Sequence, residues 1–267
     1  MKSKVLVPVA LFALLVGAFI VANYGDSVFA KSPKTRVIGG VRYNPPSPKE
    51  APEGIRAAVM LGFNIMNNPQ KYASQYVGDS VTCSNCHFNG GISPGGKNGG
   101  LSLVGVAAKY PEYRSRSGRV DDIIQRTNAC FLRSMNGKAL PADSKEMVAI
   151  VSYFHWISKG LPIYAKVPWL GLKHLESRHK PDAVQGKKVF MQSCAACHGM
   201  NGEGTKIAPP LWGKFSFNDG AGMAHLKNFA AFVYNNMPYK AANLKPDQAL
   251  DVAAYVTGQP RPHFAGK

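Results

Sequence analysis

Apolar side chains recur three or four positions apart in five stretches of this 267-residue chain. The stretches are residues 48–67, 120–135, 143–160, 182–190 and 246–257. This spacing is typical of helices that bury one face and leave the other to solvent. The pattern therefore predicts an all-α protein.

Polar and small residues mark where three of these helices begin or end. The run Asp143-Ser144-Lys145-Glu146 resembles a capping box, and Gly160 follows the last apolar position of that helix. Asp182 is a suitable cap for the fourth helix, and Gly258 closes the last one.

Segments rich in proline, glycine and basic residues divide the chain. Residues 31–47 read as an extended lead-in, and a second such segment follows residue 160. We predict an N-terminal domain over residues 31–165, a linker over 166–180 and a C-terminal domain over 181–267. Two small domains suit the length better than one large core.

The first 30 residues have the features of an export signal. Lys2 and Lys4 precede an apolar run over residues 5–22, and Ala30 suits a cleavage site. An uncleaved membrane anchor is the alternative, because the apolar run is almost long enough to span a bilayer. In both cases the rest of the protein is expected outside the cytoplasm, in the periplasm.

The two domains each contain one C-x-x-C-H motif. Cys83 and Cys86 precede His87, and Cys194 and Cys197 precede His198. Two thiols at this spacing can each form a thioether to a haem, and the histidine then lies under the iron as proximal ligand. A zinc site or a redox dithiol is the alternative, but zinc would need the pairs to converge and a dithiol needs no histidine. We predict two covalently bound haem c groups in class I cytochrome c-like domains in tandem.

The chain carries a formal net charge of +17. The basic residues are scattered, without a run of five Lys or Arg, so the charge does not indicate nucleic-acid binding. An anionic substrate or an acidic redox partner fits an exported haem protein better.

The sixth ligand of the second haem has several candidates. Met237 precedes Pro238 and matches the methionine–proline ligand loop of class I cytochromes c. A thioether ligand favours ferrous iron and raises the potential. Met223 is the alternative ligand, followed by His225 and His263, and Met237 could also serve only in packing.

The first half lacks a Met-Pro pair in the corresponding slot and has Cys130 there instead. On a helix Arg126, Cys130 and Ser134 share one face, and Arg133 lies three residues on. Nearby cations favour the thiolate, which is the form that ligates iron and acts as a nucleophile. A buried cysteine that only packs is the alternative.

The chain resembles the dihaem thiosulfate dehydrogenases over about residues 50–260. The resemblance rests on residues 76–79 (YVGD), 83–87 (CSNCH), 110–116 (YPEYRSR), 125–137 (QRTNACFLRSMNG) and 146–147 (EM). It implies that the first haem, ligated by His87 and Cys130, is the active site and that the second passes electrons out. It also implies that Arg116, Arg126 and Ser134 line the substrate pocket, and that Cys130 forms an adduct with a substrate sulfur.

One position departs from this family. Some members place a lysine directly before the methionine at the second haem and exchange the two ligands on reduction, whereas this chain has Asn236. Lys240 is too poorly placed to substitute for it. We therefore expect simple His198/Met237 ligation.

The resemblance implies oxidation of two thiosulfates to tetrathionate, with electrons passing to an external cytochrome c or high-potential iron–sulfur protein. Three alternatives stay open. The enzyme could work in reverse as a tetrathionate reductase, or the chain could be a dihaem electron carrier without a substrate. It could also be another cysteine-ligated sulfur-oxidising cytochrome that needs a partner subunit.

Overall fold

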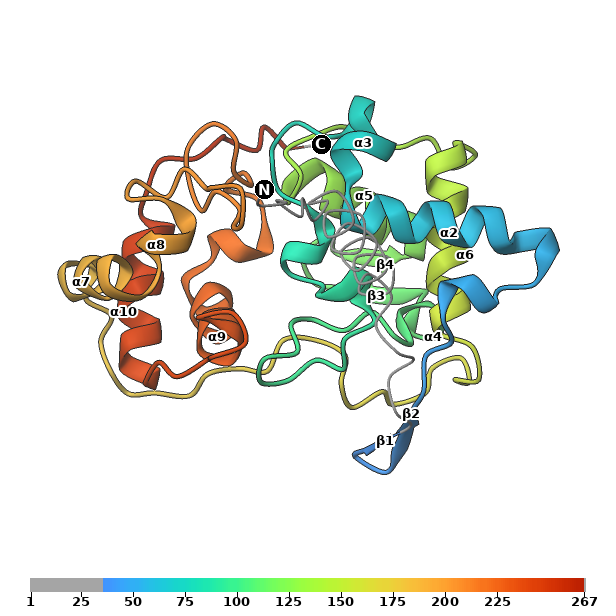
Figure 1. Cartoon of the computed structure of the whole chain (residues 1–267), viewed down its shortest axis with the longest axis horizontal. Coiled ribbons are helices and arrows are strands. Elements are labelled where there is room, and N and C mark those ends of the chain that lie inside the picture. Colours follow the sequence, from blue (N-terminus) through green and yellow to red (C-terminus); the bar gives the residue numbers. More distant parts are fainter. Residues whose placement is uncertain (1–35, 267) are drawn as a thin grey trace, which may run out of the picture.

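The computed structural model describes residues 36–266, and the predicted export signal lies outside this part of the chain. Figure 1 shows two mainly helical domains side by side, one holding α2 to α6 and the other α7 to α10. The only strands in the described residues form two short antiparallel hairpins, β1–β2 and β3–β4. The all-α prediction is therefore confirmed in its main feature. No helix within residues 36–266 has the length and apolar character needed to cross a membrane.

The N-terminal domain is built on two crossed helices, α2 (Glu53–Asn67) and α6 (Lys145–Ile157). Gly62 lets their backbones approach closely, because a Cβ atom there would lie 2.2 Å from the Ala149 carbonyl oxygen. The shorter elements are η1 (Pro48–Glu50), α3 (Pro69–Tyr72), η2 (Ser74–Tyr76), η3 (Cys83–Asn85), η4 (Asn89–Gly91), α4 (Val106–Lys109), β3 (Glu112–Arg114), β4 (Arg119–Asp121) and α5 (Ile123–Arg133).

Two predicted helices of this domain begin later than the apolar spacing indicated. The first is interrupted at Ala51, whose backbone is extended because Pro52 follows it and disfavours the helical conformation. The second begins only after Asp122, whose carboxylate accepts the backbone N–H of Gln125 at 2.7 Å. Val120, which we assigned to this helix, belongs to β4 instead.

Helix α6 begins close to the predicted position, but its N-terminus lacks the predicted capping box. Ser144 is the N-cap, and its hydroxyl accepts the backbone N–H of Met147 at 3.2 Å. A reciprocal capping box would need a Glu or Gln at the position that Met147 occupies. Ser144 is therefore a simple N-cap without the second, reciprocal hydrogen bond of a capping box.

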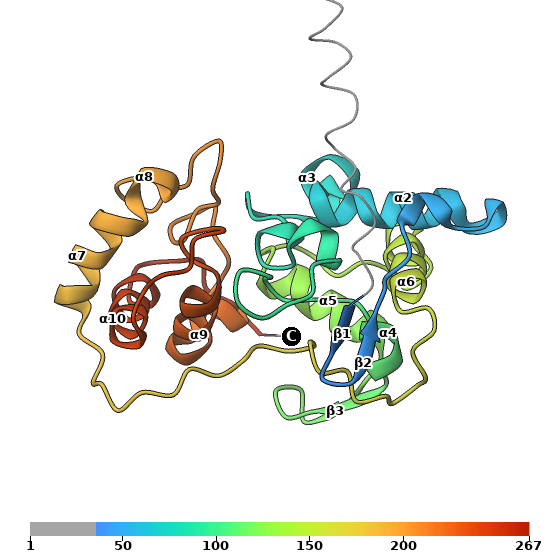
Figure 2. The ribbon, with the colours of Figure 1, turned by 60° about the horizontal axis from the view of Figure 1, so that its bottom comes forward.

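The predicted extended lead-in forms a hairpin of β1 (Arg36–Ile38) and β2 (Val41–Tyr43). Tyr43 is fully buried against Trp169, with ring centroids 4.9 Å apart. Trp169 lies in the predicted linker, so this part of the linker packs against the N-terminal domain. The remainder crosses to α7 in an extended path (Figure 2).

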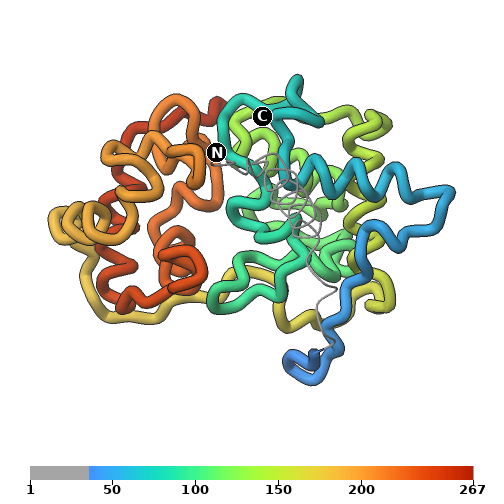
Figure 3. The backbone as a smooth tube through the Cα atoms, in the orientation of Figure 1, coloured from blue at the N-terminus to red at the C-terminus, as the bar shows by residue number. Residues whose placement is uncertain are grey.

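The C-terminal domain contains α7 (Ala183–Ser193), α8 (Ala195–His198), η5 (Gly222–Ala224), α9 (Leu226–Asn236) and α10 (Pro246–Thr257). Asp182 caps α7 as predicted, and α10 has the predicted bounds. The apolar spacing did not predict α9, because its residues 229–233 are buried without interruption and show no single apolar stripe. The last residues of the chain return to the N-terminal domain (Figure 3). There the Phe264 ring lies under the guanidinium of Arg133 at 4.6 Å.

Candidate active site and second haem site

The first C-x-x-C-H motif lies at η3, and both of its cysteines are half-buried. Burial, and then the nearby charge of Cys130, raises the pKa of Cys83 and of Cys86 to about 12. Burial lowers the pKa of His87 to about 4, so its imidazole is neutral. The His87 Nδ1 lies 2.9 Å from the carbonyl oxygen of Leu101 and donates to it, which leaves Nε2 free to bind a metal.

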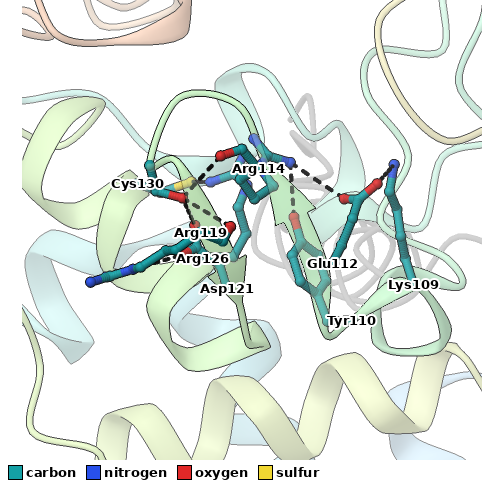
Figure 4. A network of polar contacts seen from close by, with 9 residues as sticks. Lys109, Tyr110, Glu112, Arg114, Arg119, Asp121, Arg126 and Cys130 are labelled. Atoms are coloured by element: carbon teal, nitrogen blue, oxygen red, sulfur yellow. Dashed lines mark hydrogen bonds and ion pairs between the residues drawn. The ribbon is translucent and has the colours of Figure 1, made fainter.

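Cys130 lies on α5 beside these thiols, and its sulfur has a cationic partner. The Nη1 of Arg126 donates to the Cys130 Sγ over 2.6 Å (Figure 4). The interaction with Cys130 is the main cause that raises the pKa of Arg126 above its usual value. The predicted face of this helix is therefore present, and it brings the Arg126 guanidinium and the Cys130 sulfur together next to the first haem motif.

More arginines surround Cys130 than the helix alone provides. Desolvation and the charges of Arg133, Arg126 and Arg114 lower the pKa of Arg116, whereas the charge of Cys130 raises it. Arg116 lies in the turn between β3 and β4, and its Nη1 donates to the carbonyl oxygen of Gly220 at 3.4 Å. It thus reaches the site from the hairpin and bridges to the C-terminal domain.

Ser134 is the C-cap of α5, one turn after Cys130. Its backbone N–H donates to the Cys130 carbonyl oxygen at 2.7 Å. Of the four residues assigned from sequence to catalysis, Arg126 and Cys130 are in direct contact, and Arg116 lies within electrostatic range. Ser134 is placed by the helix next to Cys130.

Tyr110 is a residue of this site that the sequence analysis did not assign. Its side chain is buried, and its hydroxyl accepts Nη1 of Arg114 at 3.0 Å. Tyr110 also lies close enough to Arg126 to contribute to the raised pKa of that guanidinium. Arg114 in turn lies 3.7 Å from Glu112, which pairs with Lys109 at 3.0 Å (Figure 4). Tyr110 therefore links the hairpin network to the guanidinium that holds Cys130.

The second C-x-x-C-H motif repeats the proximal arrangement in the C-terminal domain. The His198 Nδ1 lies 2.8 Å from the carbonyl oxygen of Pro209, and burial lowers the His198 pKa. Burial, followed by the charge of Cys197, raises the pKa of Cys194 to about 12. The Pro209 carbonyl thus fixes the orientation of the His198 imidazole.

Met237 and Met223 both pack against the core of this domain. Met237 ends α9, and its N–H donates to the Val233 carbonyl oxygen at 2.8 Å. His263 is engaged elsewhere, because its Nδ1 lies 2.7 Å from a carboxylate oxygen of Asp219 on the exposed surface. This contact makes His263 a poor candidate for the sixth ligand of the second haem.

The donor sets fit two separate haem groups. Each motif presents two thiols and a neutral imidazole whose second nitrogen is already bonded. The pairs lie in different domains, each against its own hydrophobic core. They do not converge on one ion, as a zinc site would require.

Comparison with known proteins also gives two separate cytochrome c segments. Residues 70–163 match the family model described as SoxA/TsdA, cytochrome c domain, and residues 183–259 match the model for cytochrome c. The chain contains two cytochrome c domains, which carry two covalently bound haem c groups.

Curated relatives cover both domains. The chain is 42% identical to a thiosulfate dehydrogenase of Thiomonas intermedia over 84% of its own length and 72% of that protein. It is 35% identical to one from Allochromatium vinosum, over 80% and 82% of the two chains. The solved thiosulfate dehydrogenase TsdBA of Marichromatium purpuratum superposes with a TM-score of 0.77 at 30% identity. That match covers 85% of this chain and 52% of the solved one. The chain belongs to the dihaem thiosulfate dehydrogenase family of cytochrome c oxidoreductases.

Proposed function

We propose that this protein oxidises two thiosulfate ions to one tetrathionate at the N-terminal site and passes the electrons through the C-terminal domain to an external acceptor. The observation that carries the proposal is the 2.6 Å contact between Arg126 Nη1 and Cys130 Sγ beside the first haem motif. The names of the relatives at 35–42% identity support the same substrate. Each haem, when bound, supplies a site that accepts one electron.

We propose one pair of iron ligands for each haem, and the surroundings of the two histidines and of Cys130 support them. His87 and Cys130 would hold the first haem iron, and His198 and Met237 the second. Both imidazoles are neutral and oriented by a carbonyl oxygen, as proximal ligands need to be. Cys130 differs from a packing cysteine, because a guanidinium donates directly to its sulfur.

The reaction forms one bond between the outer sulfurs of two thiosulfates and releases two electrons, with no proton consumed. Its main electrostatic cost is the approach of two dianions, which repel by about 3 kcal/mol at roughly 5 Å in water and more at lower dielectric. Arg116 and Arg126 are placed to offset this repulsion by binding sulfonate oxygens. Ser134 would add one hydrogen bond from the same helix.

We also propose that the protein works in the periplasm and that its acceptor is an acidic cytochrome c or high-potential iron–sulfur protein. The net charge of +17 favours such a partner. Tetrathionate reduction is the second candidate function, because the same residues would bind both anions. A non-catalytic electron carrier is the third candidate. It would not need the contact between Arg126 and the Cys130 sulfur.

The test is the Cys130→Ala variant, assayed for thiosulfate-dependent reduction of an artificial acceptor and for tetrathionate formation. We expect both haems to stay attached, the thiolate signature to leave the electronic spectrum, and turnover to vanish. Full activity in this variant would exclude Cys130 as the reactive group. An active wild-type protein that forms no tetrathionate would exclude the proposed product.

A further inference from the structure

Hydrogen bonds join the two domains at a contact between residues 98–100 and residues 235–242. The first segment precedes Leu101, which binds the His87 ring, and the second contains Met237. The backbone N–H of Gly100 donates to the side-chain Oδ1 of Asn236 at 2.7 Å. The N–H of Asn98 donates to the Asn235 carbonyl oxygen at 2.6 Å, and the Asn98 Oδ1 accepts the N–H of Ala242 at 3.0 Å. Three bonds therefore join residues 98–100 to residues 235–242.

Aromatic side chains pack beside these hydrogen bonds at the same contact between the domains. Phe88 directly follows His87 and is almost fully buried. Its ring lies 5.1 Å from that of Tyr239 and 6.2 Å from that of Phe232, both on the C-terminal domain. The hydrogen bonds are thus partly shielded from water, which makes them costly to break.

Asn236 holds the central position in this interface. It is 1% exposed, and its amide has a partner at each end. Besides the bond from Gly100, its Nδ2 donates to the Phe232 carbonyl oxygen at 3.0 Å. The side chain can therefore adopt only one orientation without leaving a buried polar atom unpaired.

The residues next to Gly100 and Asn236 indicate what the hydrogen bond between them does. Leu101, whose carbonyl oxygen accepts the His87 ring N–H, directly follows Gly100. Met237 directly follows Asn236. One hydrogen bond thus connects the segment that orients the proximal histidine of the first site to the segment that presents the methionine of the second.

We propose that Asn236 is a positioning residue through which the N-terminal domain holds Met237 on the second haem. The inference rests on the proposed function in so far as Met237 is the ligand there. It extends that function, because the ligation of the electron-exit site then depends on residues 98–100 of the other domain. Electron exit and the active site are mechanically coupled at this contact.

Imidazole competition on the oxidised holoprotein tests this proposal without an activity assay. Imidazole displaces a weakly held methionine, and loss of the sulfur-to-iron absorption band reports the displacement at the second haem alone. In Asn236→Ala the imidazole concentration that removes half of the band should fall roughly tenfold, which is the effect of losing a buried hydrogen bond. In Asn98→Gly it should fall roughly threefold, because one cross-domain acceptor is lost and glycine tolerates the Asn98 φ of 59°.

Asn235→Ala is the matched control. Its side-chain amide donates only within α9, to the Ala231 carbonyl oxygen at 2.8 Å, and its cross-domain bond uses the backbone. This variant should bind imidazole like the wild type. Equal changes in Asn235→Ala and Asn236→Ala would mean general loosening of α9 and would overturn the proposal.

Two further outcomes separate this inference from the ligand assignment. Wild-type imidazole binding in Asn236→Ala, in a protein whose band is lost in Met237→Ala, would overturn the positioning role and leave the proposed function intact. A band that survives Met237→Ala would overturn the ligand assignment and this inference with it. Asn98→Gly keeps the test valid if Asn236→Ala fails to fold, since the changed residue lies in the other domain.

Discussion

Arg126→Gln is the substitution that best separates an enzyme from an electron carrier. The Arg126 side chain is half-buried and donates to the Cys130 sulfur at 2.6 Å, so glutamine removes a charge from a partly desolvated site. A charged hydrogen bond lost in such a site costs roughly 2–3 kcal/mol, which corresponds to a fall in kcat/KM for thiosulfate of about 30- to 150-fold.

The assay is steady-state turnover with a neutral artificial acceptor at two ionic strengths. The defect should appear at both, because Arg126 acts on the substrate and on Cys130 rather than on a docked protein. The spectrum of the first haem should change as well, since the thiolate loses its nearest cation.

Arg119→Gln is the matched control for this measurement. Arg119 lies on the neighbouring hairpin, and its side chain is 65% exposed and pairs with Asp121 at 3.1 Å. We expect it to leave kcat/KM within about twofold of the wild type, as a surface pair contributes little. A defect in Arg126→Gln that appears only with a protein acceptor and disappears at high salt would refute the substrate role.

Three other predictions address the rest of the molecule. Tyr110→Phe removes the hydroxyl that accepts from the Arg114 guanidinium beside Arg126 and should lower kcat/KM about tenfold, the effect of about 1.5 kcal/mol for a hydrogen bond with one charged partner; an unchanged value would exclude the link. Met237→Ala should lose the sulfur-to-iron band and slow electron exit; if Met223→Ala does so instead, the ligand is Met223. The hydrogen bond that His179 Nε2 donates to the Asp251 carboxylate raises the pKa of His179, with Asp247 and Asp182 acting in the same direction. The protonated pair therefore stabilises the C-terminal domain below the ordinary histidine pKa, and this stability is lost as pH rises through the raised value. In His179→Gln the thermal midpoint should lose this pH dependence; a wild-type pH profile would contradict it.

Sequence spacing determined those parts of the protein that depend on neighbours within one helical turn. The two haem motifs set thiols and an imidazole within five residues, so their chemistry can be read without a fold. Arg126 and Cys130 are four residues apart on one helix, and their contact follows from helical geometry.

Local capping decided two boundaries that the apolar pattern alone placed wrongly. Asp122 begins α5 by accepting the Gln125 N–H, although Val120 continued the apolar spacing. Pro52 interrupts the first helix by a different effect, because it disfavours the helical conformation at Ala51. These signals were present in the sequence, but the apolar period outweighed them in the prediction.

Tertiary structure alone decided which distant segments complete the sites. Tyr110 reaches Arg126 because β3 pairs with β4 and returns the chain to α5. Gly100 and Asn236 are 136 residues apart and meet only when the two domains pack. Such contacts depend on the shapes of complete cores, and no sequence period encodes the distance between residues on separate elements.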